Sequence, residues 1–120
     1  MLSLKNKKAV ITGGGSGIGK AIAQLFVKQG AEVHIIELAV EAAQEAANEI
    51  KALGGNVEVH ACNVANHAQV LNVFDQIGNL HILVNNAGIA HVGKADNTSE
   101  DDFDRVMNVN VKGVYNCLFA

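Results

Sequence analysis

The chain of 120 residues is long enough for one domain with a hydrophobic core. Its composition is 49% hydrophobic and 18% charged, as in ordinary soluble globular proteins, and no apolar run is long enough to cross a membrane. The net charge is −3 and the Lys and Arg residues form no stripe, which argues against nucleic acid or an acidic membrane surface as a partner.

The cysteines and histidines bear on the compartment and on metal binding. Cys62 and Cys117 lie far apart in no metal-ligand spacing, so we expect two free thiols in a reducing, cytoplasmic setting. The five histidines are scattered along the chain, and we therefore expect no metal site. We also expect no signal peptide, because the first residues reach an apolar strand too soon.

Short apolar runs rich in β-branched residues alternate with segments of helical periodicity. In chain order the predicted elements are strand 8–12, helix 17–29, strand 32–36, helix 40–53, strand 57–61, helix 69–77, strand 80–84, and a last helix that runs to the end of the chain. Thr98 or Ser99 is the predicted cap of that last helix, and the acidic residues that follow favour its N-terminus.

The helical segments carry apolar residues three and four positions apart. Ile18, Ile22, Leu25 and Phe26 share one apolar face of the first helix, and Val40 is expected to point inward from the second. Strand and helix alternate four times without a repeat or a linker, which is typical of a parallel sheet with helices on both faces. We predict one α/β domain over residues 1–120, a Rossmann-like doubly wound sheet with strand order 3-2-1-4.

The glycine-rich stretch after the first strand can be interpreted in two ways. From Gly14 it is one residue short of the triphosphate-binding pattern G-x-x-x-x-G-K-[ST], but Ala21 stands where that pattern needs a hydroxyl for Mg²⁺. Lys20 is also expected to face solvent from the first helical turn. A dinucleotide-binding turn fits better, because glycines between a strand and a helix let the backbone approach a pyrophosphate at the helix N-terminus.

An acidic residue at the end of the second strand supports the dinucleotide interpretation. Glu37 follows the glycine turn by about twenty residues, where a carboxylate accepts hydrogen bonds from the adenosine ribose. A carboxylate there would also repel the 2′-phosphate of NADP, and no Lys or Arg stands beside it at position 38. The expected cofactor is therefore NAD.

Three motifs resemble successive signatures of the short-chain dehydrogenase/reductase family. They are Thr12–Gly19 (TGGGSGIG), Asn85–Gly88 (NNAG) and Asn108–Gly113 (NVNVKG), and their order and spacing match the family over the entire chain. The resemblance implies an oxidoreductase that moves hydride between nicotinamide and a small alcohol or carbonyl substrate.

The resemblance also implies which residues contact the cofactor. They are Gly13, Gly15, Ser16, Gly17, Ile18, Glu37, Leu38, Asn63, Val64, Asn86, Ala87, Gly88 and Val109. The Ser16 hydroxyl would donate to a phosphate oxygen. Asn63 stands where the family usually has Asp, and its side-chain carbonyl can accept the same hydrogen bond from the adenine amino group.

The catalytic machinery of the family is only partly represented. Asn110 corresponds to the catalytic asparagine, which holds a water that joins a lysine to a proton relay. The family also needs a serine and a Tyr-x-x-x-Lys pair, but Tyr115 is followed four residues later by Phe119, and no serine follows Ser99.

We therefore expect the chain to be the N-terminal, cofactor-binding half of a longer, homo-oligomeric enzyme, and to be inactive alone. The alternative is a non-catalytic dinucleotide-binding or interaction module, if the natural chain ends at Ala120. The codons that follow residue 120 distinguish the two, since only the enzyme needs the missing Ser and Tyr-x-x-x-Lys.

Overall fold

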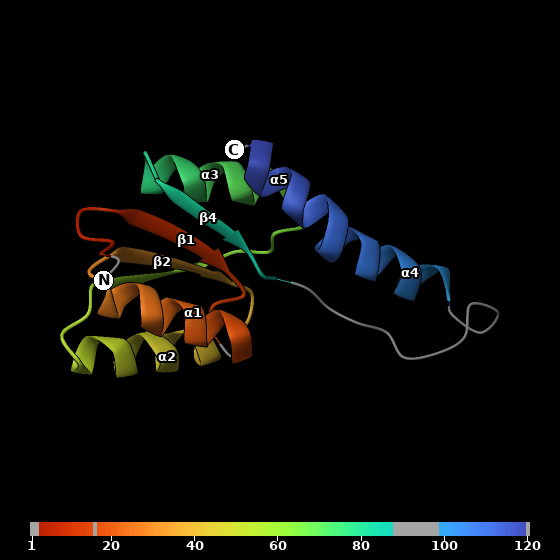
Figure 1. Cartoon of the computed structure of the whole chain (residues 1–120). Helices are drawn as coiled ribbons and strands as arrows, with labels where there is room; N and C mark the ends of the chain where they lie inside the picture. The colour runs from red at the N-terminus through yellow and green to blue at the C-terminus, as the bar shows by residue number, and fades with distance from the viewer. Residues whose placement is uncertain (1–2, 16, 88–98, 120) are drawn as a thin grey trace.

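The structure of the chain is a computed structural model that describes residues 3–15, 17–87 and 99–119 (Figure 1). Its elements are β1 (Lys8–Thr12), α1 (Gly17–Lys28), β2 (Glu32–Glu37), α2 (Val40–Ala52), β3 (Val57–Ala61), α3 (His67–Ile77), β4 (Ile82–Asn85), α4 (Glu100–Met107), the π-helical turn η2 (Asn108–Lys112) and α5 (Gly113–Phe119). The alternation predicted from the sequence is confirmed, and no boundary of the first seven elements moves by more than two residues.

The four strands form one parallel sheet in the order β3-β2-β1-β4, as predicted. Ile11 of the central strand β1 lies between Ile35 of β2 and Val84 of β4. From β1 the chain crosses to β2 and then β3 on one side, and it later returns to the other side of β1 to form β4. The sheet therefore has its switch point between β1 and β4.

Helices cover both faces of the sheet (Figure 1). α1 and α2 lie on one face, over a core made by Ile11, Ala23, Ala31, Val33, Ile35, Ala43, Ala47, Ile50 and Val57. α3 and α5 lie on the other face, over a core made by Val10, Ile36, Cys62, Val64, Val70, Val73, Phe74, Ile77 and Cys117. Successive residues of β1 and β2 enter opposite cores, as the two-residue period of a strand requires.

The predicted inward faces of α1 and α2 were partly wrong. Ile18 is 75% exposed and Leu25 is 55% exposed, while Gly19 and Ala23 are the buried residues of α1. α1 approaches the β1 turn so closely that a Cβ on Gly19 would collide with the Gly13 carbonyl oxygen. Small residues therefore occupy the contact stripe. Val40, the first residue of α2, is likewise exposed.

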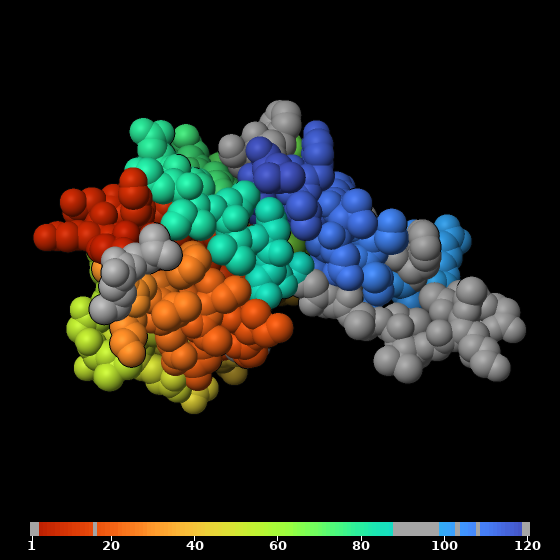
Figure 2. Space-filling view, viewed as in Figure 1, coloured from red at the N-terminus to blue at the C-terminus, as the bar shows by residue number. Residues whose placement is uncertain are grey.

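The last helix begins as predicted but does not run straight on as one α-helix. The Ser99 hydroxyl accepts a hydrogen bond from the Asp102 N–H at 3.1 Å, which confirms Ser99 as the cap. Thr98, the alternative cap, lies outside the described residues. The π-helical turn η2 then interrupts the helix, and α4 extends away from the sheet while α5 packs against α3 (Figures 1 and 2).

A buried amide holds α5 in place. Asn116 is fully buried, donates from Nδ2 to the Val64 carbonyl oxygen at 2.9 Å, and bonds through Oδ1 to His67 Nδ1 at 2.8 Å. None of the helices in the described part of the chain reaches the length and apolarity that a membrane span requires.

Replacing a buried residue of α2 should destabilise the fold, whereas replacing its exposed neighbour should not. Ile50→Ala should lower the free energy of unfolding by about 2–5 kcal/mol, because Ile50 is 2% exposed in the core under α2. Leu53→Ala, at a residue that is 85% exposed, should change it by less than about 0.5 kcal/mol. Urea denaturation measures both, and equal effects would contradict the packing described for α2.

Candidate functional site

A groove of about 410 Å³ opens at the carboxyl ends of the strands, which is where open α/β sheets bind ligands. We call it the strand-end groove. It is lined by Gly13, Ile36, Glu37, Leu38, Ala39, Cys62, Asn63, Val64, Asn86, Ala87 and Val109.

Most of the predicted site residues meet in this groove. The predicted residues among its lining are Gly13, Glu37, Leu38, Asn63, Val64, Asn86, Ala87 and Val109. Gly17 and Ile18 lie outside the lining, exposed in the first turn of α1, and Gly15 is buried beside α2. Ser16 and Gly88 fall outside the described residues.

The Thr12 hydroxyl joins the two sides of the groove. Thr12 Oγ1 accepts hydrogen bonds from the N–H groups of Asn86 and Ala87, both at 3.0 Å, and donates to the Val84 carbonyl oxygen at 3.4 Å. Thr12 is buried at the end of β1, so its hydroxyl sets where the chain turns after β4. The sequence motif contains Thr12, but the resemblance assigned it no role.

A second hydrogen bond joins the turn after β4 to the glycine turn after β1. The Asn86 side-chain amide donates from Nδ2 to the Gly13 carbonyl oxygen at 3.0 Å. Gly13 has a φ of +69°, which side chains rarely tolerate, and a Cβ there would lie 3.0 Å from the Ala87 Cα. The glycine turn therefore packs directly against Ala87, and only a residue without a Cβ fits at position 13.

Glu37 presents its carboxylate at the edge of the groove. Its Oε2 accepts from the Gly15 N–H at 3.2 Å and its Oε1 accepts from the Ala39 N–H at 3.3 Å. Within the described residues no ion pair joins Glu37 to a basic side chain. Gly15 thus contacts the carboxylate that faces the groove, which explains its place beside the groove rather than in its lining.

Asn63 lies in the groove with its side chain engaged in a local turn. Its Oδ1 accepts from the Ala65 N–H at 3.0 Å, and its own N–H donates to Gln69 Oε1 at 3.0 Å. The side-chain oxygen keeps a second lone pair, since an amide carbonyl accepts two hydrogen bonds.

Asn110 occupies the π-helical turn η2 rather than a regular helix. It is exposed and follows Val109, which lines the groove. Turns of this kind are frequent at functional sites, because the extra residue redirects side chains that a regular helix would carry around its axis. The sequence predicted one helix that runs through Asn110 to the end of the chain, with a helix-bend residue as the alternative interpretation of Asn110, and the π-turn interrupts the helix at this residue.

The geometry of Lys20 argues further against a triphosphate site. Its Nζ pairs with Glu49 Oε2 of α2 at 2.8 Å, so Lys20 is half-buried and not turned to solvent as predicted. The ion pair forms because α1 and α2 lie side by side on the same face of the sheet (Figure 1). The ammonium group of Lys20 is therefore directed toward α2.

Three lining residues were missed by the motif-based prediction: Ile36, Ala39 and Cys62. All three stand at or just after the end of β2 or β3. Their position at strand ends was the available signal, because the carboxyl ends of parallel strands meet at one edge of the sheet.

Cys62 and Cys117 are buried free thiols, as predicted. Burial, and to a smaller extent the neighbouring Cys62, raises the pKa of Cys117 to about 11. Burial also raises the pKa of Cys62. Both thiols are therefore protonated near neutral pH and are poor nucleophiles.

Removing the Thr12 hydroxyl should destabilise the junction between β1 and β4. Thr12→Val leaves the Asn86 and Ala87 N–H groups without their acceptor, and we expect a loss of about 1–3 kcal/mol in the free energy of unfolding. Thr12→Ser keeps the hydroxyl and should cost about 1 kcal/mol, the value of one methyl group. Chemical denaturation tests the pair, and an equal loss in both variants would refute the role of the hydroxyl.

The buried thiol Cys117 should make stability depend on alkaline pH. Its pKa is raised from 9.0 to about 11 on folding, so the unfolded chain loses this proton first. The stabilising contribution is complete below about pH 9 and is lost as the pH rises toward about 11. Denaturation in reducing buffer at about pH 8 and about pH 10.5 measures the decline in the free energy of unfolding. The decline should be smaller in Cys117→Ala than in the unchanged chain, and an identical decline in both would contradict the contribution of this thiol.

Comparison with known proteins agrees with the fold and the sheet order. The sequence profile of the short chain dehydrogenase family matches residues 7–120. The chain is 42% identical over 116 residues to an uncharacterized oxidoreductase of Thermotoga maritima, a match that covers 95% of this chain and 46% of the relative.

Two solved structures are also similar. One is a short chain dehydrogenase/reductase from Burkholderia phymatum in complex with NAD, with a TM-score of 0.92, 32% identity, and coverage of 99% of this chain and 44% of that one. The other is a 3-ketoacyl-(acyl-carrier-protein) reductase from Brucella melitensis complexed with NADH, with a TM-score of 0.87, 37% identity, and coverage of 98% and 49%. The chain spans about half the length of the curated relatives it matches. With its motifs, its 3-2-1-4 sheet and this family match, the chain belongs to the short-chain dehydrogenase/reductase family.

Proposed function

We propose that the protein containing this chain is an NAD-dependent oxidoreductase that moves hydride between nicotinamide and a small alcohol or carbonyl substrate. The chain would form its cofactor-binding part. The observation that carries the choice of cofactor is the Glu37 carboxylate, held at the edge of the strand-end groove by the N–H groups of Gly15 and Ala39.

The fit of a dinucleotide to the groove rests on backbone that lies open where side chains would obstruct it. Gly13 and Ala87 both line the groove, and neither carries a side chain larger than a methyl group. Gly17 and Ile18 begin α1, whose first N–H groups have no helical acceptor and favour a pyrophosphate. Ser16 would add its hydroxyl to the same phosphates, and Gly88 would continue the surface after Ala87.

Glu37 supports NAD over NADP on electrostatic grounds. A carboxylate accepts hydrogen bonds from two free ribose hydroxyls but repels a 2′-phosphate. Two unit charges about 4 Å apart cost about 4 kcal/mol at an effective dielectric constant of 20. The relatives from B. phymatum and B. melitensis, which were solved with NAD and NADH, support the same choice.

The remaining groove residues would position the rest of the cofactor. Leu38 and Val64 would flank the adenine. Asn63 would accept a hydrogen bond from the adenine amino group through the second lone pair of its Oδ1. Asn86 would border the ribose, and Val109 the nicotinamide side of the groove. When bound, the nicotinamide supplies or accepts the hydride, and the protein supplies its position.

Asn110 would act as a positioning residue for proton transfer. Its place in η2, directly after the groove residue Val109, supports this role, because π-helical turns within helices are frequent at functional sites. The amide would hold a water in a proton relay, and would not itself exchange the substrate proton.

The assembly and the compartment are part of the same proposal. Apolar side chains remain exposed on η2 and α5, among them Val111, Tyr115 and Leu118, which supports a homo-oligomer. Two buried free thiols support a reducing, cytoplasmic setting.

Cofactor titration tests the proposal. The chain should bind NADH at least about tenfold more tightly than NADPH. This ratio corresponds to only a modest part of the repulsion expected between the Glu37 carboxylate and the 2′-phosphate of NADPH. Glu37→Gln removes the charge and should bring the two dissociation constants together. Glu41→Gln, which removes a charge from the exposed face of α2, should leave the ratio unchanged. Fluorescence of the reduced nicotinamide measures the dissociation constants of the unchanged chain and of both variants. Tighter binding of NADPH than of NADH by the unchanged chain would overturn the assignment of NAD as the cofactor.

A further inference from the structure

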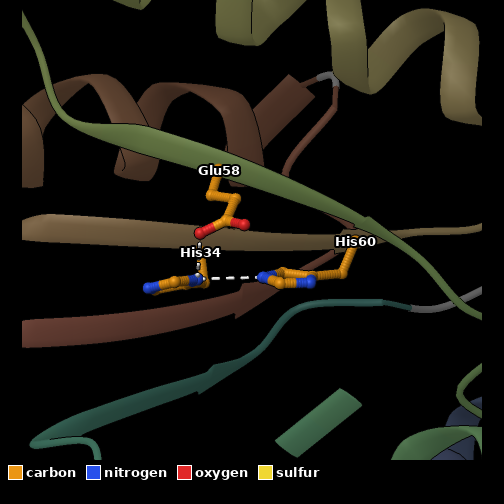
Figure 3. Close-up of side chains that lie close together, drawn as sticks. All are labelled: His34, Glu58 and His60. Carbon is orange, nitrogen blue, oxygen red and sulfur yellow. Dashed lines mark hydrogen bonds and ion pairs between the residues drawn. The ribbon is translucent and has the colours of Figure 1, made fainter. Parts of the chain in front are cut away.

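Three side chains that are scattered in the sequence meet on one face of the sheet, away from the strand-end groove. They are His34 of β2 with Glu58 and His60 of β3, which we call the His-Glu cluster (Figure 3). His34 Nδ1 lies 2.9 Å from His60 Nε2 and 3.7 Å from Glu58 Oε2. One possible ligand atom from each of the three lies within 4.8 Å of the others.

The parallel register of β2 and β3 creates this cluster. His34 stands opposite Glu58, and His60 follows Glu58 by two residues, so all three side chains leave the same face. Figure 3 shows the Glu58 carboxylate and the His60 ring both turned toward His34. The expectation that the scattered histidines form no metal site therefore missed a grouping that only strand pairing produces.

We propose that the His-Glu cluster is a binding site for a divalent transition-metal ion of the zinc type. His34 Nδ1, His60 Nε2 and one oxygen of Glu58 would be the protein ligands. Two imidazoles and a carboxylate are a ligand set that zinc accepts in proteins, with a water completing four-coordination.

The distances suit such an ion after a small adjustment. Zinc binds imidazole nitrogen at about 2.0–2.1 Å, so two nitrogens in tetrahedral coordination lie about 3.3 Å apart. The observed separations of 2.9 and 3.7 Å lie on either side of that value. Side-chain rotations that move these atoms by a few tenths of an ångström would suffice, and the paired strands can stay in place.

A second carboxylate already orients the most buried ligand. Glu32 Oε2 lies 2.7 Å from His34 Nε2 and accepts its proton, which leaves the lone pair of His34 Nδ1 directed at the cluster. The hydrogen bond from His34 lowers the pKa of Glu32. A carboxylate on the far nitrogen of a ligating histidine is a common partner in zinc sites, where it sets the tautomer and raises the basicity of the ligand.

The surroundings allow an ion to enter and remain. The His34 side chain is only 6% exposed, whereas that of Glu58 is 67% exposed, so the cluster has a buried floor and an open rim. Burial lowers the pKa of His60, and the neighbouring His34 lowers it further, although Glu58 opposes the shift. In the absence of a metal, His60 Nε2 donates to His34 Nδ1 across the 2.9 Å contact. On metal binding, His60 would ligate through Nε2 as the neutral tautomer that carries its proton on Nδ1.

The site would have a structural role separate from the proposed cofactor function. β3 is an edge strand of the described sheet, and a bound ion would cross-link it to β2. His34 and His60 each stand two residues before a groove residue, Ile36 and Cys62, so the cluster lies about 7 Å along the strands from the strand-end groove. None of its three ligands lines the groove, so binding of metal and binding of NADH can be measured separately.

Titration of the metal-free, untagged chain with Zn²⁺ tests the proposal by calorimetry. We expect one ion per chain, with affinity reduced at least about tenfold in Glu58→Gln and in His60→Gln. Because the Glu58 side chain is exposed, Glu58→Gln should fold as the unchanged chain does, and circular dichroism verifies this. His81→Gln, at an exposed histidine outside the cluster, should bind as the unchanged chain does.

Two further readouts separate a built site from adventitious binding. Co²⁺ should give the absorption of a low-symmetry, four-coordinate ion in the unchanged chain, and Glu32→Gln should weaken its binding through His34. Zn²⁺ should raise the Tm of the unchanged chain but not that of His60→Gln. The absence of stoichiometric binding would overturn the proposal, as would equal affinity in the unchanged chain, Glu58→Gln and His60→Gln.

Discussion

The hydroxyl of Thr12 is the contact on which the strand-end groove depends. It lies at the end of the central strand and accepts hydrogen bonds from the N–H groups of Asn86 and Ala87, which belong to the turn after β4. The Asn86 amide then binds the Gly13 carbonyl oxygen, so the glycine turn and the turn after β4 hold each other. Because β1 and β4 meet at the switch point of the sheet, these bonds define the mouth of the groove.

Close packing of α1 extends this constraint to the rest of the fold. Gly19 lies against the Gly13 carbonyl, and Ala23 continues the contact, which is why larger residues such as Ile18 and Leu25 remain outside. On the same face α2 follows, and Gly15 connects its start to the Glu37 carboxylate. One chain of short contacts therefore links the glycine turn to the acidic residue on which the proposed choice of NAD depends.

The strand-end groove and the His-Glu cluster use the sheet in different ways. The strand-end groove forms where strands end and backbone groups become free, which is the general place for ligands in this architecture. The His-Glu cluster forms in the middle of paired strands, where register alone decides which side chains are neighbours. Membership in the short-chain dehydrogenase/reductase family accounts for the first and does not require the second.

The sequence by itself determined the alternation of strands and helices, the sheet order, the family, and most of the groove lining. These follow from local periodicity, from the handedness of crossovers, and from motifs in which glycine or asparagine is needed at fixed spacing. Only the tertiary structure decided the π-turn at Asn110, the Lys20–Glu49 ion pair, and the meeting of His34 with His60. The ion pair and the histidine contact depend on how distant segments pack and in what register, and no local pattern encodes such contacts.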